Sequence, residues 1–263
     1  MSKPHTYLID LDGCIWLGGQ LLPGSTEFVA HLKAERHRVC YLTNISGATG
    51  ADLATRLSSL GIPTSATHVF TPLDALSGLE TLKTAQPVLA LGSPRLSEVL
   101  VASGIDVIGA LDSAEAAKSV VLGHYGDLTL AHLDAMANVL WRGGLLVALN
   151  ADTRVPSRAG RILVGVGAIA ACLELAANAK ALVVGKPSAT FFEAALRSFG
   201  ATAQTSTMIG DSIEADILGA KQVGMSTIYL GAEVEGHLAD ARADDLADLL
   251  NTMCRAERTH HDR

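Results

Sequence analysis

The stretch YLIDLDG, residues 7–13, joins a short apolar run to two carboxylates and a glycine. Apolar runs that end in polar residues are typical of buried parallel strands, whose carboxyl ends face the ligand crevice of a doubly wound sheet. Asp10 and Asp12 are separated by one residue of extended chain, so their side chains start on the same side, and Gly13 permits a sharp turn. This stretch predicts an α/β fold with a chemical site at a strand end.

Three further stretches repeat this design and supply the groups that phosphate chemistry requires. They are VCYLTN at 39–44, LVVGKP at 182–187 and TMIGDSIEAD at 207–216. Asp211 adds a third carboxylate to an oxygen-rich pocket that suits a hard cation such as Mg²⁺. Thr43 adds a hydroxyl and Lys186 an ammonium group, which together with a metal suit a dianionic phosphoryl group. We therefore expect the four strand ends to converge on one site.

The order DLDG, TN, GKP and GDS followed by a second Asp resembles the four motifs of the haloacid dehalogenase superfamily. About 140 residues separate Thr43 from Lys186, which is room for the large inserted αβ cap of subfamily IIA, the NagD-like and p-nitrophenyl phosphatase-like enzymes. Local matches to that branch are LNAD at 149–152, GKPS at 185–188 and GDSIEADILGA at 210–220. The resemblance implies a Rossmann-like doubly wound parallel core sheet with a large inserted αβ cap domain.

The resemblance also implies a phosphatase that works through an aspartyl phosphate and uses Mg²⁺. Asp10 would attack phosphorus, and Asp12 would protonate the leaving alkoxide and then deprotonate the hydrolytic water. Asp10, the backbone carbonyl of Asp12, and Asp211 would hold the metal. Asp216 would stand behind these ligands and orient water or Lys186. Two close carboxyl groups with opposite tasks need different pKa values, which a metal bound to one side chain and not the other would provide.

Phosphate binding and reaction class are implied in the same way. Thr43, the backbone at Asn44, and Lys186 would hold the phosphoryl oxygens. A carboxylic acid at position 12 favours a phosphatase over a dehalogenase, because dehalogenase relatives carry no carboxylate there. The motifs are shared by enzymes of sugar phosphates, phosphoglycolate, pyridoxal phosphate and nucleoside monophosphates, so they leave the substrate open.

Helices and strands alternate along the chain, which predicts two parallel sheets covered by helices. On the resemblance we place the core at 1–82 and 180–263 and the cap at 83–179. A cap of this size favours small phosphorylated metabolites as substrates. Residues 24–37 also form a predicted helix, with Ser25 or Thr26 as its cap. Other predicted helices cover 51–60, 72–82, 96–102, 130–141, 166–177, 189–198 and 213–223, and predicted strands cover 88–91, 119–122, 145–149, 181–184, 207–209 and 227–230.

One loop of the predicted cap, residues 150–161, has the composition of a specificity loop. Its three arginines could give a substrate carboxylate or a second phosphate a bidentate partner. Solvated surface arginines are the open alternative, and the first two polar residues of the loop are also suited to shaping its turns. The residues concerned are Asn150, Asp152, Arg154, Arg158 and Arg161.

Two residues beside the predicted nucleophile have open roles. Cys14 stands where relatives commonly carry Thr or Val, and we expect a small filler rather than a redox switch, because an ordinary thiol is mostly protonated at neutral pH. Trp16 lies in the segment beside the nucleophile that should form a flap. It either lines the substrate entrance or packs that flap against the cap.

Three other functions compete with the phosphatase. The segment RILVGVGAIAA, 161–171, has the G-x-G-x-x-A outline of an NAD-dependent oxidoreductase, but the next predicted strand ends in Gly185 and Lys186 rather than in the acidic residue that holds the ribose. Close packing at the start of a helix explains those glycines better. An inactive scaffold is disfavoured because every expected reactive position is filled, and a phosphotransferase or phosphomutase remains an alternative.

Composition agrees with a metabolic enzyme. The net charge of −7 and the scattered basic residues argue against a nucleic-acid partner. The longest uncharged apolar stretch is too short to span a bilayer, and Asp10 and Asp12 interrupt any signal-peptide core, so we expect no membrane partner and a cytoplasmic location. The four cysteines are widely spaced, which predicts reduced thiols. Relatives often pair through their caps, which makes a homodimer an open alternative.

Overall fold

The computed structural model describes residues 4–108, 111–156, 162–234, 236 and 238–261. The chain divides into two compact units. The first unit takes in the chain up to Thr43, the segment Ala51–Val69 and the chain from Phe192 onward, and the second takes in Asn44–Gly50 and Phe70–Phe191. Each unit contains a parallel sheet with helices, so the predicted α/β class is confirmed.

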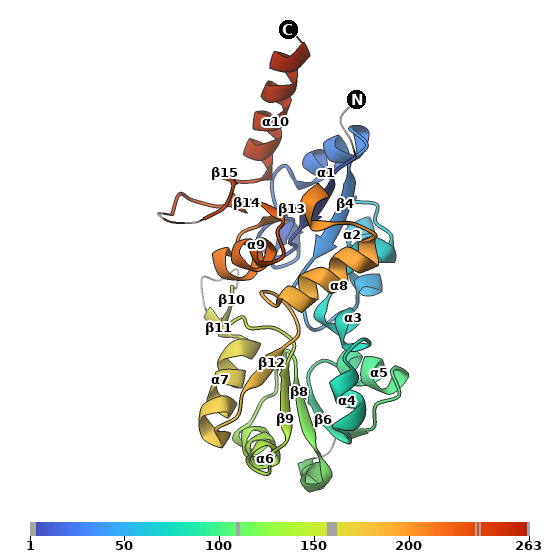
Figure 1. Ribbon diagram of the computed structural model, residues 1–263, viewed down its shortest axis with the longest axis vertical. Coiled ribbons are helices and arrows are strands. Elements are labelled where there is room, and N and C mark those ends of the chain that lie inside the picture. Colours follow the sequence, from blue (N-terminus) through green and yellow to red (C-terminus); the bar gives the residue numbers. More distant parts are fainter. Residues whose placement is uncertain (1–3, 109–110, 157–161, 235, 237, 262–263) are drawn as a thin grey trace. The chain divides into compact units, whose positions relative to one another are not determined.

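The sheet of the first unit has the strand order β15-β14-β13-β1-β4-β5 (Figure 1). Its central strand β1 lies between β13 and β4, and both pairings are parallel. Three of its four residues are buried, since both faces are covered. The strands are β1 (Thr6–Ile9), β4 (Arg38–Leu42), β5 (Val69–Phe70), β13 (Ser206–Gly210), β14 (Ser226–Leu230) and β15 (Ala241–Ala243).

Register aligns the predicted reactive residues of this sheet. Ile9 lies opposite Ile209 on one side and Tyr41 on the other. Asp10 therefore follows β1 at the same edge at which Thr43 follows β4 and Asp211 follows β13. Because the strands are parallel, these three residues belong to loops that leave one edge of one sheet.

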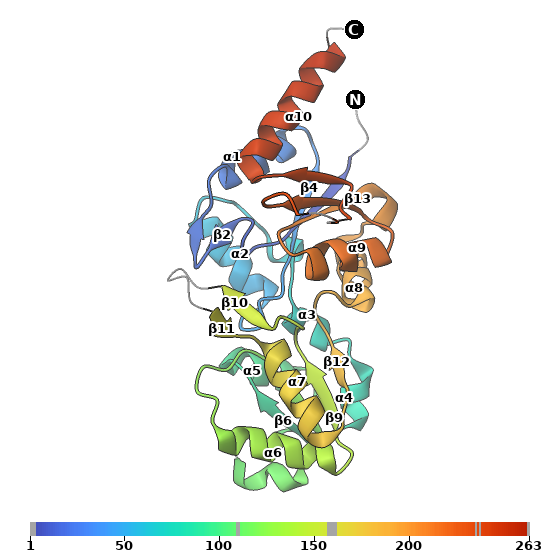
Figure 2. The same ribbon diagram turned by 90° about the vertical axis from the view of Figure 1, so that its left-hand side faces the viewer.

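The helices of the first unit lie close to the predicted positions, except for the C-terminal helix, which was not predicted. Figure 2 shows α10 (Leu246–His261) beside α1 (Ser25–Ala34). The predicted cap of α1 was wrong: Gly24 is the N-cap, because Ser25 is the first helical residue and its hydroxyl donates to the carbonyl of Ile15 at 2.9 Å. The remaining elements are the hairpin β2 (Trp16–Leu17) and β3 (Gln20–Leu21), α2 (Gly50–Ser59), η1 (Ala66–His68), η3 (Ala203–Thr205), the π-helix η4 (Ile213–Leu218) and α9 (Gly219–Gln222).

The second unit has a five-stranded parallel sheet of order β12-β9-β8-β6-β7. Side chains of β8 alternate between two apolar clusters, with Val120 and Leu122 in one and Val121 in the other. Figure 1 shows α6 (Leu130–Trp141) and α7 (Val166–Ala177) on one side of these strands and α4 (Glu80–Thr84) and α5 (Pro94–Ala102) on the other. The strands are β6 (Val88–Leu91), β7 (Val107–Ile108), β8 (Ser119–Leu122), β9 (Leu145–Ala148) and β12 (Ala181–Val183).

Helices cover both faces of this sheet. Helices α6 (Leu130–Trp141) and α7 (Val166–Ala177) supply one cluster, and α3 (Pro72–Leu76), α4 (Glu80–Thr84) and α5 (Pro94–Ala102) supply the other. The antiparallel pair β10 (Arg154–Pro156) and β11 (Ile162–Val164), the 3₁₀ helix η2 (Leu111–Ala116) and α8 (Ala189–Phe199) complete the described elements. Within the described part of the chain, no helix is both long enough and apolar enough to cross a membrane.

The expectation that the strand before the GKP motif lies in the core sheet was wrong. The strand before the GKP motif, β12, pairs with β9 of the second sheet and not with the strands that precede Asp10, Thr43 and Asp211. The predicted limits of the cap, 83–179, also lie inside the second unit, which extends further at both ends. The physical reason is apolar burial, since Leu73, Leu76 and Val184 belong to the same cluster as the sheet of the second unit.

Candidate active site

The turn after β1 presents the predicted nucleophile. The Asp10 backbone N–H donates to the carbonyl of Ile209 at 2.9 Å, which continues the ladder between β1 and β13. The carbonyl of Leu11 then accepts from the N–H groups of Ile15 at 2.9 Å and Trp16 at 3.0 Å. This closes a tight turn that leaves Asp10 buried and Asp12 exposed.

Gly13 is the residue that lets this turn approach the third carboxylate. Its φ of +96° lies in the left-handed region, which side chains with a Cβ rarely adopt. A Cβ at this position would also lie 2.6 Å from Cγ of Asp211, far inside van der Waals contact. The glycine of the DLDG motif therefore serves both the backbone conformation and the close approach of Asp211.

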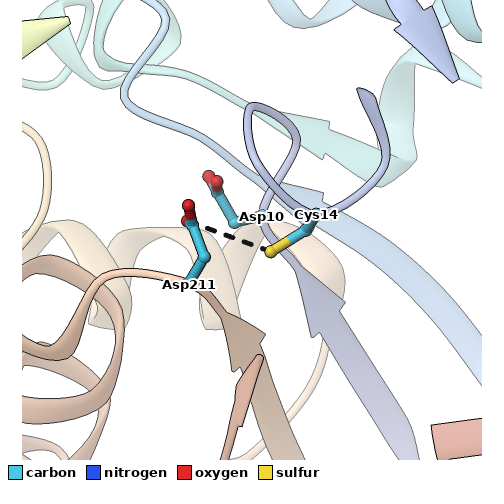
Figure 3. Close-up of side chains that lie close together, drawn as sticks. All are labelled: Asp10, Cys14 and Asp211. Carbon is cyan, nitrogen blue, oxygen red and sulfur yellow. Dashed lines mark hydrogen bonds between the residues drawn. The ribbon is translucent and has the colours of Figure 1, made fainter. Parts of the chain in front are cut away.

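Asp10 and Asp211 come together with the thiol of Cys14. Their ligand atoms all lie within 4.8 Å of one another, and Figure 3 shows the three side chains close together, with the Cys14 sulfur joined to Asp211 by the dashed line. The Cys14 thiol donates to Oδ1 of Asp211 at 4.0 Å, a long contact for a weak donor. Two carboxylates at this separation repel unless a cation lies near them, and carboxylate oxygens are the donors that Mg²⁺ prefers. The donor set therefore fits the predicted metal.

Asp216 shapes the loop that carries Asp211. Its carboxylate accepts from the backbone N–H of Ser212 at 3.1 Å, and the Ser212 hydroxyl accepts from Ala215 N–H at 3.1 Å. A Cβ at Gly210 would overlap the Asp216 side chain, so this position also needs a glycine. Asp216 is 1% exposed, and a buried carboxylate bonded to the residue after Asp211 restrains that loop.

Thr43, the last residue of the first segment of the first unit, is buried directly after β4. Asn44 and Lys186 belong to the second unit. The Asn44 amide there makes a closed set of hydrogen bonds. Its Oδ1 accepts from the Lys186 N–H at 2.8 Å, and its Nδ2 donates to the Lys186 carbonyl at 3.1 Å. The same Nδ2 lies 3.0 Å and 3.2 Å from the two carboxylate oxygens of Asp152. Asn44 thus holds the backbone of the GKP motif on both sides of Lys186, which is itself 2% exposed.

The loop after β9 supports this arrangement. Asn150 donates from Nδ2 to the Asn44 carbonyl at 2.8 Å and accepts the Asp152 N–H at 3.2 Å, so both residues shape the loop geometry. Gly165 and Gly167 pack against the same loop, with their N–H groups donating to the Thr153 carbonyl at 3.0 Å and the Asp152 carbonyl at 2.9 Å. Added Cβ atoms would overlap that backbone. The G-x-G-x-x-A outline is therefore accounted for by close packing.

Two of the three loop arginines, Arg158 and Arg161, lie outside the described residues. Arg154 is exposed at the start of β10, and its contact with substrate stays a prediction. Trp16 is fully buried, with the Arg56 guanidinium 4.7 Å from the centre of its ring. This stacking fixes the flap from within the first unit.

Cys14 is the residue whose neighbourhood sequence reasoning missed. Its thiol was expected to be a small filler, yet it faces two carboxylates. The available signal was its place in the chain, four residues after Asp10 and directly after the glycine of a turn. All four cysteines are free, and burial raises the pKa of the Cys40 thiol to about 12, which makes that one inert.

Comparison with known proteins identifies the family of this chain. The family model described as haloacid dehalogenase-like hydrolase matches residues 7–106, and a second model, HAD-hydrolase-like, matches residues 183–252. The glycerol-3-phosphate phosphatase of Gallus gallus is 31% identical, with 96% of this chain and 93% of that protein covered. The crystal structure of a 4-nitrophenylphosphatase from Thermotoga maritima has a TM-score of 0.82 and 27% identity, with 94% of this chain and 97% of that one covered.

A third comparison bears on the fold. A glycerol phosphate phosphatase of Mycobacterium tuberculosis, crystallised in complex with calcium, matches with a TM-score of 0.80 and 24% identity over 93% of this chain and 74% of that one. All three named proteins are phosphatases, and the NagD protein of E. coli shares the same fold with a TM-score of 0.80. This chain belongs to the haloacid dehalogenase-like hydrolase family, as a phosphoric monoester hydrolase of its NagD-like and p-nitrophenyl phosphatase-like branch.

Proposed function

We propose that this chain is a Mg²⁺-dependent phosphatase that hydrolyses the phosphomonoester of a small phosphorylated metabolite through an aspartyl phosphate on Asp10. The observation that supports this most is the meeting of Asp10 and Asp211, from neighbouring parallel strands, with ligand atoms within 4.8 Å. Asp10 is buried and Asp211 is exposed, and two carboxylates held this close are suited to binding a cation beside a phosphoryl group.

The chain's own residues would divide the reaction between them. A carboxylate oxygen of Asp10 attacks phosphorus as the bond to the leaving alkoxide breaks, and Asp12 gives that alkoxide its proton. Asp12 then takes a proton from water, whose oxygen attacks phosphorus and releases Asp10 and inorganic phosphate. Asp12 is exposed, which suits a group that exchanges protons with water.

The metal site would be formed by Asp10, the backbone carbonyl of Asp12, and Asp211. When bound, Mg²⁺ supplies positive charge that offsets the repulsion between an anionic nucleophile and an anionic phosphoryl group. Asp216 would restrain the loop that carries Asp211, through its hydrogen bond to Ser212. These donors are oxygen atoms throughout, which agrees with a hard cation.

Phosphoryl binding would fall to Thr43, the backbone at Asn44, and Lys186. This part of the proposal is supported by the order of the sequence motifs and by the hydrogen bonds that hold the Lys186 backbone to Asn44. An ammonium group on a restrained backbone is a fixed positive charge for a phosphoryl oxygen.

The relatives support the proposed substrate class. Those named above are phosphatases of glycerol-3-phosphate, glycerol phosphate and 4-nitrophenyl phosphate, all small monoesters. We propose such a monoester here and not a nucleic acid or a membrane component. We further propose that the substrate carries a carboxylate or a second phosphate, and that Arg154, Arg158 or Arg161 binds this group. A cytoplasmic location and a homodimer stay predictions.

The test is phosphate release from a panel of monoesters, with and without Mg²⁺, for the wild type beside Asp10→Asn. The panel holds glycerol-3-phosphate, 4-nitrophenyl phosphate, phosphoglycolate, pyridoxal phosphate and a nucleoside monophosphate. We expect Mg²⁺-dependent release that the variant loses. Release that persists in Asp10→Asn would contradict the nucleophile, and transfer of phosphate to an alcohol in preference to water would favour the phosphotransferase.

A further inference from the structure

Cys14 brings a soft ligand to a site otherwise built of hard oxygen donors. Its sulfur lies with the carboxylates of Asp10 and Asp211 in one group whose ligand atoms are all within 4.8 Å (Figure 3). At a tetrahedral Zn²⁺ centre, a thiolate sulfur at about 2.3 Å and a carboxylate oxygen at about 2.1 Å are about 3.6 Å apart. The observed separation of Cys14 Sγ and Asp211 Oδ1, 4.0 Å, differs from that by a few tenths of an ångström.

A cavity lies beside this group, within the first unit. It measures about 380 Å³, and Gly13, Cys14 and Asp211 line it together with Tyr229, Asp245 and Leu246. Cys14 is only 2% exposed by itself, but the cavity gives an ion in solution a path to its sulfur. Asp245 adds a carboxylate to the lining, whereas the Asp244 carboxylate is paired with the Arg242 guanidinium.

The two types of ligand in this group, carboxylate and thiolate, select different metal ions. Carboxylates alone suit Mg²⁺ and Ca²⁺, whereas a thiolate selects softer ions such as Zn²⁺. We propose that Cys14 is a metal ligand, and that Asp10, Cys14 and Asp211 together bind a thiophilic divalent cation of the Zn²⁺ type in competition with Mg²⁺. On binding, the sulfur–metal bond forms as the thiol proton leaves to the buffer. The inference rests on the proposed function in that Asp10 and Asp211 are also the proposed Mg²⁺ ligands.

The first test uses Co²⁺ as a spectroscopic substitute for Zn²⁺. A Co²⁺ ion bound to a thiolate gives a charge-transfer band in the near ultraviolet, which oxygen ligands do not give. We expect the metal-free wild type to develop this band, saturating at one ion per chain, and to lose it when Zn²⁺ is added. Cys14→Val should show no band, and Cys172→Ser, which removes an exposed thiol on α7, should keep it.

Calorimetry on the same proteins gives the affinities. Loss of the sulfur should weaken Zn²⁺ binding in Cys14→Val at least about tenfold and weaken Mg²⁺ binding by a smaller factor. Equal weakening of both ions, or a band of wild-type strength in Cys14→Val, would overturn the inference.

A second measurement needs no variant at the site. X-ray absorption at the zinc edge of the wild type and Cys172→Ser, each loaded with one ion, should show one sulfur neighbour at about 2.3 Å. A shell of oxygen and nitrogen alone would overturn the inference. The proposed function is judged separately, because Mg²⁺-dependent hydrolysis that Asp10→Asn abolishes would stand even if no sulfur neighbour were found.

Discussion

The two units use polar residues near their strand ends in opposite ways. In the first unit, a glycine turn brings the carboxylates of Asp10 and Asp211 within 4.8 Å, together with a thiol. In the second unit, the neutral amide of Asn44 is held by hydrogen bonds to both sides of Lys186 and to Asp152. Like charges brought together oppose folding, whereas a saturated amide network supports it. The first arrangement therefore indicates a ligand, and the second indicates a support for the residue it surrounds.

Replacing the proposed nucleophile Asp10 should have the largest effect on activity. Asp10→Asn should lower the rate of hydrolysis by about 10⁴-fold or more, because an amide does not attack phosphorus. It also removes one of two close carboxylates, which relieves their mutual repulsion, so its unfolding temperature without Mg²⁺ should lie close to that of the wild type. Thermal unfolding with and without Mg²⁺ checks this, since the ion should no longer raise the unfolding temperature. A large loss of stability without Mg²⁺ would contradict the contrast.

Asn44→Ala should, unlike Asp10→Asn, mainly lower the free energy of unfolding. It leaves the N–H and carbonyl of Lys186 without the amide that pairs with them, which should cost about 3 kcal/mol. The matched control is Asn138→Ala, an exposed residue whose amide makes one 2.8 Å bond to the Asp134 carbonyl and whose loss should cost under about 1 kcal/mol. Denaturant unfolding of both variants measures the difference. Equal costs would mean that the Asn44 network is not a support.

Gly13→Ala should lower both the rate of hydrolysis and the stability of the first unit. The added methyl group would push against the Asp211 carboxylate, and displacing this proposed metal ligand should lower the rate about 100-fold. Gly61→Ala is the control, because Gly61 has a similar φ of +89° with open space around it. It should cost about 1 kcal/mol of stability with no loss of rate. A rate in Gly13→Ala equal to that of the control would show that Asp211 is not held where the turn requires a glycine.

Asp240 offers a comparison, because it is a carboxylate paired with a lysine. The Lys221 ammonium, 2.6 Å away, together with hydrogen bonds from Thr227, holds the pKa of Asp240 below its usual value. A lowered pKa in the folded state adds stability that is present above the unfolded pKa of about 4 and is lost as the pH falls through the folded value. The pair is largely exposed, so the contribution should be about 0.5 kcal/mol.

Denaturant unfolding at pH 7 and pH 3 measures the contribution of the pair of Asp240 and Lys221 to the free energy of unfolding. Asp240→Asn should reduce the acid loss of stability by that amount, and Asp106→Asn, which removes another exposed carboxyl, should change it less. An unchanged acid loss in Asp240→Asn would show that the ion pair contributes nothing to folding.

Local patterns predicted the elements that depend on local contacts. Helices at 130–141 and 166–177 and strands at 88–91 and 119–122 have the predicted limits. The predicted helix at 72–82 is instead two, α3 and α4, with a capping box between Thr71 and Asp74 at the start of the first. The predicted helix at 213–223 begins as a π-helix, in which the Ile217 N–H donates to the Ser212 carbonyl at 3.2 Å. The Asp216 carboxylate that bonds to Ser212 makes this opening turn part of the loop at Asp211.

The sequence by itself determined the α/β class, the order of the motifs and the residue types that end each strand, because apolar periodicity and turn residues act over a few neighbours. Only the tertiary structure decided that β12 pairs with β9, that α3 and α4 pack with the second sheet, and that Cys14 faces Asp10 and Asp211. Strand pairing and side-chain proximity depend on contacts between residues far apart in the chain, which local periodicity does not encode.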